Sequence, residues 1–125
     1  METLVTVHSW TRWLVLAALI VGVVVGVQRY RSKTEWNPSL YQLAVMVVDI
    51  QVTIGIVIWI FDDGWSETVF YKVIHPVFML LALGISHMGL AIAKKRNNVR
   101  SWAIASGGFV AALVLIIGAI PWDRL

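Results

Sequence analysis

The chain contains no cysteine and few charged residues. Each of these two features excludes a class of protein. Without cysteine there is no disulfide, no cysteine-bound iron–sulfur cluster and no thiol chemistry. Charged residues make up 14% of the 125 positions, whereas hydrophobic residues make up 59%. These charges are too few to cover the surface of a soluble domain of this size. The sequence therefore indicates a membrane protein, in agreement with a mean hydropathy of +0.80.

Four apolar runs come close to or exceed the length of about 20 helical residues that crosses a bilayer. They occupy residues 10–27, 40–61, 76–93 and 102–120. Their hydrophobicity is continuous rather than alternating, which favours helices over the strands of a barrel. The runs use most of the chain, and short connections favour an up-down-up-down four-helix bundle. We therefore predict one all-α transmembrane domain over residues 1–125.

The charges in the connections predict how this bundle is oriented. The basic residues are Arg29, Arg31 and Lys33 in the first connection and Lys94, Lys95, Arg96 and Arg100 in the third, whereas the second contains Asp62, Asp63, Glu67 and Lys72. Basic connections stay on the cytoplasmic side of a membrane. We therefore expect a multi-pass protein of the cell (inner) membrane, with connections one and three in the cytoplasm and both termini outside. Topology also accounts for the pI near 9.6, so a nucleic-acid partner is not expected.

Aromatic residues and glycines add two further expectations. Aromatic side chains near the ends of the runs are typical of the belts at the two membrane surfaces. We assign Trp10, Trp13, Trp59, Trp65 and Trp122 to the outer belt and Tyr30, Trp36, Tyr41 and Trp102 to the inner one. Small residues often mark close helix contacts in lipid. We expect such contacts at Gly22, Gly26, Gly84, Gly107 and Gly108.

His8 and His75 are the first candidate site, because ionisable residues at membrane depth are costly and mark functional positions. His8 opens the first helix at the outer face, and His75 opens the third, where Pro76 predicts a first helical turn. Two imidazoles at one depth on different helices can ligate the iron of a b-type haem from opposite sides. Arg12, four residues after His8, can pair with a haem propionate.

Two alternatives remain open for this pair. Each histidine can simply reach from the helix end to headgroups and water, as amphipathic side chains do at an interface. The two can also bind copper or zinc without haem, together with the acidic residues of the second connection. The spacing of these residues matches no recognised zinc motif, so this signal is weak.

His87 is a separate problem, because it lies twelve residues beyond His75. This spacing puts it about 18 Å deeper and about 120° further round the helix, so the two do not share a face. Asp49 falls near the same depth. We predict a hydrogen bond or ion pair between Asp49 and His87 that faces the bundle interior. A proton relay, a quinone headgroup site and a second haem ligand are the alternatives for this pair.

Several short motifs resemble those of a family of small four-helix membrane proteins labelled cytochrome b-like. The motifs are His8-Ser9-x-x-Arg12-Trp13, Gln51-x-x-x-Gly55, the run from His75 to Gly89 and the run from Gly118 to Trp122. The resemblance covers nearly the whole chain and implies a b-haem electron carrier or a small subunit of a respiratory redox complex, with the three histidines as the matching positions. Family members often have an acidic residue at the position of Ile74 and a histidine at that of Asp49, so an inner haem would lack one ligand here.

Two functions follow as expectations. The first is an electron-transfer subunit that holds one b-type haem between His8 and His75, within a larger membrane redox complex. The second is a cofactor-free accessory subunit that stabilises a respiratory or photosynthetic membrane complex. A metal or quinone transporter lined by Asp49 and His87 is a third class, which the short chain disfavours. An enzyme acting by itself is less expected than any subunit role.

Overall fold

The structure is a computed structural model that describes residues 2–61, 68 and 70–120, and within these residues all regular structure is helical. The four long helices are α1 (Glu2–Arg31), α2 (Ser39–Phe61), α3 (His75–Arg96) and α4 (Arg100–Gly118). A five-residue π-helical turn, Phe70–Ile74, leads directly into α3. Each long helix has the length and apolar composition needed to cross a membrane. For the described residues, the prediction of an all-α fold with four helices long and apolar enough to span a membrane is confirmed.

Helix α1 is longer than the apolar run that predicted it. It begins at Glu2 rather than at residue 10, and its 30 residues correspond to about 45 Å of helix. This exceeds the roughly 30 Å of hydrocarbon in a bilayer. Hydropathy reports which residues tolerate lipid, whereas a helix continues for as long as its backbone hydrogen bonds do. His8 is therefore two turns inside α1 and does not open it.

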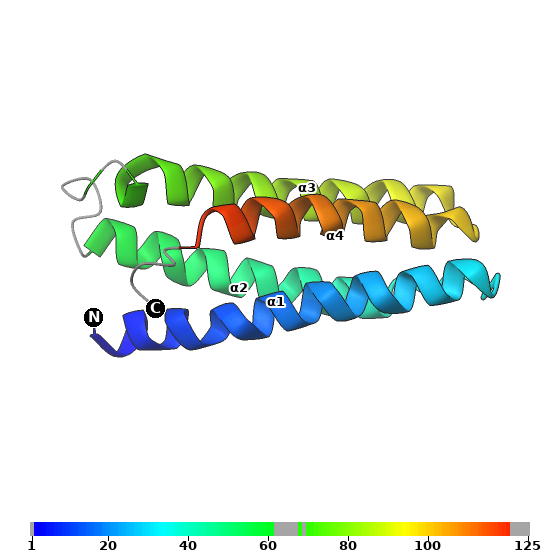
Figure 1. Cartoon of the computed structure of the whole chain (residues 1–125), viewed down its shortest axis with the longest axis horizontal. Coiled ribbons are helices and arrows are strands. Elements are labelled where there is room, and N and C mark those ends of the chain that lie inside the picture. Colours follow the sequence, from blue (N-terminus) through cyan, green and yellow to red (C-terminus); the bar gives the residue numbers. More distant parts are fainter. Residues whose placement is uncertain (1, 62–67, 69, 121–125) are drawn as a thin grey trace.

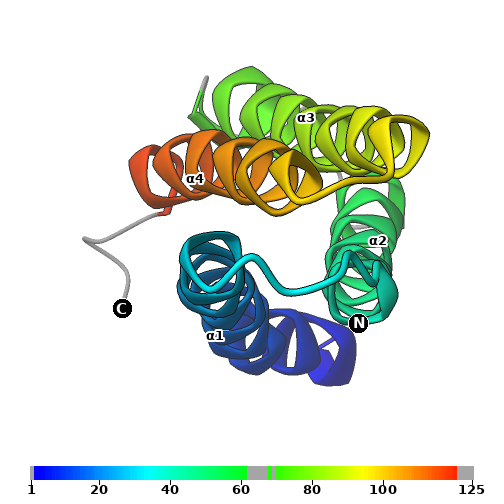
Figure 2. The ribbon, with the colours of Figure 1, turned by 90° about the vertical axis from the view of Figure 1, so that its right-hand side faces the viewer.

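The helices lie along one long axis, and the ribbon reverses direction from each helix to the next (Figure 1). Viewed along the bundle, they surround a common interior (Figure 2). Each helix packs against its sequence neighbours, and α1 also packs against α4. The contact between α3 and α4 is the most extensive, whereas that between α2 and α3 is the least extensive of the four.

The two ends of the bundle differ in charge. Basic residues occupy the last turns of α1 and α3 and the first residue of α4, which all lie at the right-hand end in Figure 1. These residues are Arg29, Arg31, Lys94, Lys95, Arg96 and Arg100. The opposite end holds the first turns of α1, the start of α3 and the end of α4. We call them the basic end and the histidine end, because His8 and His75 lie near the second.

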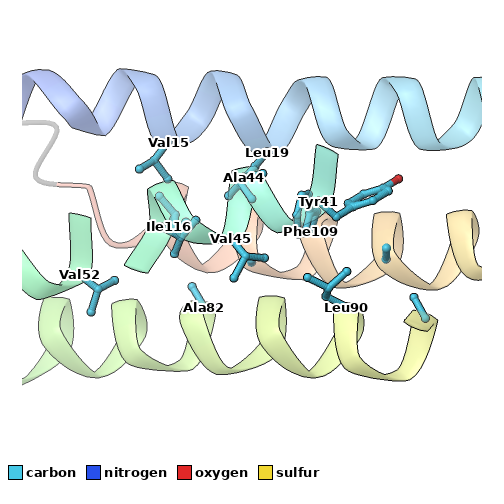
Figure 3. Close-up of a cluster of buried hydrophobic side chains, with 14 of the residues drawn as sticks. Val15, Leu19, Tyr41, Ala44, Val45, Val52, Ala82, Leu90, Phe109 and Ile116 are labelled. Carbon is cyan, nitrogen blue, oxygen red and sulfur yellow. The ribbon is translucent and has the colours of Figure 1, made fainter. Parts of the chain in front are cut away.

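Small apolar side chains fill most of the space between the helices. Val15 and Leu19 of α1 meet Ala44 and Val45 of α2 and Ala82 of α3 in a cluster of buried residues (Figure 3). Larger rings gather toward the basic end, where Tyr41, Phe109 and Trp102 are fully buried. The interior is therefore packed with valine and alanine along much of its length and closed by aromatic rings near one end.

The buried rings correct the predicted inner belt. Tyr41 and Trp102 lie in the core, and Trp36 stacks on Tyr41 and meets Trp102 edge-on at 4.9 Å between centroids. The Trp102 indole donates to the carbonyl of Thr34 at 2.9 Å. Sequence position gave the depth of these rings but not the direction in which each helix turns them. Tyr30 is exposed, as a belt residue would be.

The outer aromatic residues divide into described and undescribed ones. Trp10 and Trp13 are exposed on α1, as a lipid-facing belt requires, and Trp59 donates a hydrogen bond to the carbonyl of Lys72 at 3.2 Å. Trp65 and Trp122 lie outside the described residues.

The glycine predictions hold at some positions and fail at others. A Cβ at Gly22 would lie 2.7 Å from the Phe109 ring, and one at Gly89 would lie 3.2 Å from the backbone of Gly108. The first distance would force the ring or the helix to shift, and the second is tighter than an ordinary van der Waals contact. Gly84 and Gly107 have no neighbouring atom within 4 Å of such a Cβ, so neither makes a close helix contact within the described part of the chain. Both are on the outer surface of the bundle, which sequence spacing alone did not reveal.

Candidate functional site

His8 of α1 and His75 of α3 lie side by side at the histidine end. Their ring centroids are 6.4 Å apart and their planes are nearly perpendicular, at 85°. Sixty-seven positions separate them in the sequence, and the fold brings them to one depth. The structure thus brings together the two residues that the sequence predicted as a ligand pair.

Helix α2 positions His8 through its backbone and its ring. The Gln51 amide donates to the His8 carbonyl at 2.7 Å, while the carbonyl oxygen of the same side chain accepts from the Thr11 hydroxyl. One turn further along α2, a Cβ at Gly55 would lie 3.1 Å from Cε1 of the His8 ring. Gln51 therefore ties α1 to α2 at this depth, and Gly55 leaves the space that the imidazole occupies.

The His75 ring is held by the end of α4. Its Nδ1 lies 2.8 Å from the carbonyl oxygen of Ala119, the residue that follows α4. A carbonyl can only accept, so Nδ1 carries the proton and the lone pair of the ring is on Nε2. Metal-binding histidines are commonly oriented in this way, by a hydrogen bond from the other ring nitrogen to a backbone carbonyl.

Pro76 lies in the first turn of α3, as the sequence predicted, but this turn is not the free start of a helix. The π-helical turn Phe70–Ile74 precedes it without a break. In a regular α-helix the proline ring would clash with the carbonyl four residues earlier, that of Lys72, and could not donate to it. The wider π-helical turn accommodates this ring. The Trp59 indole donates to the Lys72 carbonyl instead, so the acceptor that Pro76 leaves unused is satisfied by α2.

Two buried nitrogens near the imidazoles have no hydrogen-bond partner among the described residues. They are Nδ1 of His8 and Nε of Arg12. Arg12 lies one turn from His8, its guanidinium is 4.9 Å from the centroid of the Trp13 ring, and its charge acts on both imidazoles. Buried polar atoms without partners are costly and rare. A polar group bound at this end of the bundle would satisfy them.

The donor set suits haem iron better than a bare metal ion. Zinc and copper sites take three or four protein donors, and residues 2–61 and 70–120 contain no group of three or more metal-ligating side chains. Asp62, Asp63 and Glu67 of the predicted copper or zinc site lie outside the described residues. Haem iron needs only axial ligands from the protein, because the porphyrin supplies the other four donors.

The separation of the rings fits two axial ligands of one iron. With metal–nitrogen bonds of about 2 Å, two imidazoles on opposite sides of one ion have centroids roughly 6 Å apart. The observed 6.4 Å agrees with this value, and perpendicular ring planes are compatible with ligation from opposite faces. Arg12 is the cationic residue nearest in sequence to His8, and its Nε has no hydrogen-bond partner among the described residues. Its guanidinium can therefore pair with a haem propionate. The residues present therefore fit a b-type haem.

The second predicted pair is formed, but on the outside of the bundle. His87 Nε2 lies 2.7 Å from Asp49 Oδ1, which joins α3 to α2. The two side chains are 50% and 42% exposed, so the expectation that they face the interior is wrong. Asp49 follows Val48 of the buried stripe on α2 and is rotated off it. His87 is rotated away from His75 by about 120°, and His75 already faces the bundle.

The chain was compared with protein-family models, with curated proteins and with solved structures, and none of the three comparisons finds a match. The resemblance to cytochrome b-like proteins therefore stays a prediction from short motifs.

We expect Gln51→Leu to destabilise the protein by about 1 kcal/mol, because it removes the hydrogen bonds to the His8 carbonyl and the Thr11 hydroxyl. The control is Gln42→Leu, an exposed position on the same helix. SDS-induced unfolding in mixed micelles, followed by circular dichroism, measures both variants. Equal stabilities for the two would show that Gln51 does not tie α1 to α2.

Proposed function

We propose that the chain is a small integral membrane electron-transfer subunit that holds one b-type haem between His8 and His75. The observation that supports this most directly is the pairing of two imidazoles from α1 and α3 with centroids 6.4 Å apart. A bound haem supplies one-electron redox chemistry, which no side chain of this cysteine-free chain provides. The chain's own residues bind and orient that group.

Each residue around the pair has a role in this proposal. His8 and His75 would hold the haem iron through their imidazoles, and the Ala119 carbonyl holds the His75 ring in the tautomer with its lone pair on Nε2. Gly55 makes room for the His8 ring, so the imidazole can lie against α2. The guanidinium of Arg12 pairs with a haem propionate. The negative charge of the propionate compensates the positive charge of this guanidinium, which is buried near the two imidazoles.

The distribution of basic residues favours an orientation that puts the site near the outer face of the membrane. Lysine and arginine gather at the basic end, and such residues stay on the cytoplasmic side. In an up-down-up-down bundle this leaves both termini and the histidine end outside. Electrons would then pass near the outer face of the cell membrane, between a quinol or protein donor and a larger redox complex. At 14.0 kDa the chain is suited to be one subunit of such a complex.

A reduced-minus-oxidised visible spectrum of the purified protein tests this proposal. Protein expressed in haem-replete cells is expected to show the α-band of a b-type haem at close to one haem per chain. Circular dichroism on the same sample reports whether the four helices are intact. Well-folded protein without haem would contradict the proposal and favour the alternative function, a cofactor-free accessory subunit.

A further inference from the structure

The Asp49–His87 pair lies near the middle of the membrane-spanning helices. Asp49 is ten residues from Ser39 and twelve from Phe61, the two ends of α2, which puts it about 15 Å from the nearer end. The hydrocarbon core of a bilayer is about 30 Å thick. The hydrogen bond of 2.7 Å places His87 at the same depth. Both side chains are nevertheless about half exposed on the outer surface of the bundle.

Ionisable side chains at this depth are rare, and nearly all of them face a protein interior or a water-filled cavity. In the described residues, the bond between Asp49 and His87 uses one carboxylate oxygen and one imidazole nitrogen. The other oxygen, Oδ2, and the other nitrogen, Nδ1, are polar atoms that hydrocarbon cannot satisfy. Contact with another protein surface that carries complementary polar atoms would remove this cost.

We propose that this face, defined by Asp49 and His87 on α2 and α3, is a two-fold contact with a second copy of the chain. In a contact of this symmetry, residue i of one copy meets residue j of the other, and j meets i. When the pair is an imidazolium and a carboxylate, Nδ1 of His87 is a donor and Oδ2 of Asp49 is an acceptor, and the two lie side by side at one depth. A second copy rotated by 180° about the membrane normal brings its His87 to Asp49 and its Asp49 to His87. The face is thus complementary to itself.

The surroundings of the pair permit close approach. Gly84 lies one turn before His87 and has open space where a Cβ would be, so a helix backbone can come near. Large apolar side chains, including Met46 and Met88, are exposed on either side of the pair. They offer van der Waals contact, which drives helix association in lipid. The proposal does not depend on haem, because the histidine end is not part of this face.

Single cysteines test the contact cleanly because the chain has none of its own. Two differently tagged copies are co-expressed, one carrying Met46→Cys and the other Met88→Cys, since a two-fold contact sets α2 of one copy against α3 of the other. A short bis-maleimide is then added to intact membranes. The matched control pairs Val24→Cys on α1 with Val114→Cys on α4, which are exposed on other faces. We expect a cross-linked product carrying both tags from the first pair and background from the control.

Exchanging Asp49 and His87 tests whether their hydrogen bonds, and not only the exposure of the cysteines, bring the two copies together. Asp49→His in both copies should lower the cross-linked yield about tenfold, because hydrogen bonds to a charged group are lost. The double swap Asp49→His with His87→Asp restores complementarity and should restore the yield. A yield from Met46→Cys and Met88→Cys no higher than the control overturns the proposal. A cross-linked product that contains one copy and a different protein also overturns it, in favour of a subunit of another kind.

Discussion

Bound haem is expected to be lost almost completely from His8→Ala and from His75→Ala, and to be retained at the wild-type level in His87→Ala. Each of the first two changes removes one of two proposed axial ligands. His87 instead faces outward and bonds to Asp49, about 18 Å along α3 from His75. The measurement is the haem-to-protein ratio and the reduced-minus-oxidised spectrum of each purified variant.

An alanine variant can lose haem because it loses its fold. A conservative variant is therefore measured beside the three alanine variants. A methionine thioether is an alternative axial ligand that raises the reduction potential of haem iron. His8→Met should therefore keep haem with a higher midpoint potential and an altered spectrum. His8 is the better position for this change, because the His75 ring is also held by the Ala119 carbonyl.

Three results would contradict this assignment of ligands. Haem with an unaltered spectrum in His8→Ala would remove His8 from the site. Loss of haem from His87→Ala, with helicity intact, would move the site toward the middle of the bundle. The His8→Met variant could also keep its fold and yet bind as little haem as His8→Ala. That result would mean that the His8 side chain contributes packing rather than a ligand.

Hydropathy was enough to predict the four spans, because lipid leaves a backbone of this composition no alternative to helices. It was not enough to predict their ends. Helix α1 extends to Glu2, and the third span begins within a π-helical turn. That turn directly precedes the first turn of α3, which holds Pro76, and its Lys72 carbonyl accepts a hydrogen bond from the Trp59 indole of α2. Counting apolar residues does not reveal such a contact between separate segments.

Depth was predictable for the polar residues, whereas direction was not. Counting residues put His8 level with His75 and Asp49 level with His87, and the structure brings each pair into contact. Counting says nothing about which way a helix is rotated in the bundle. For that reason the second pair was predicted inside and lies outside. The buried stripe on α2, which includes Val45, Val48 and Val52, passes beside Asp49 and not through it.

The same limit applied to Tyr41 and Trp102, which were predicted for a belt and lie in the core. Gly26 shows how closely packed that region is. A Cβ at Gly26 would overlap the Tyr41 hydroxyl oxygen and Oγ of Ser106, which are hydrogen-bonded to each other at 2.8 Å. The Tyr41 hydroxyl also donates to the Gly22 carbonyl at 3.0 Å, so the Ser106 hydroxyl is the donor to Tyr41. One added methyl group therefore cannot enter without displacing a buried hydrogen-bonded pair.

We expect Gly26→Ala to destabilise the protein by about 2–4 kcal/mol, from overpacking together with the disrupted hydrogen bond. Gly107→Ala is the matched control, because no atom lies within 4 Å of the added Cβ. The control should leave stability unchanged or slightly higher, since alanine is the better helix former. SDS-induced unfolding in mixed micelles compares the two.

The cause of the Gly26 effect can be separated from a general intolerance of α1 to substitution. Removing both oxygens with Tyr41→Phe and Ser106→Ala takes away the two atoms that the new methyl group meets. Replacing both partners of a hydrogen bond by apolar groups is often nearly neutral. In that background Gly26→Ala should cost about 1–3 kcal/mol less than in the wild-type chain, the range of coupling for residues in contact. Part of the cost remains, because Cζ of Tyr41 would still lie 3.2 Å from the added carbon. An equal cost in both backgrounds would show that the two hydroxyl groups are not what excludes a side chain at Gly26.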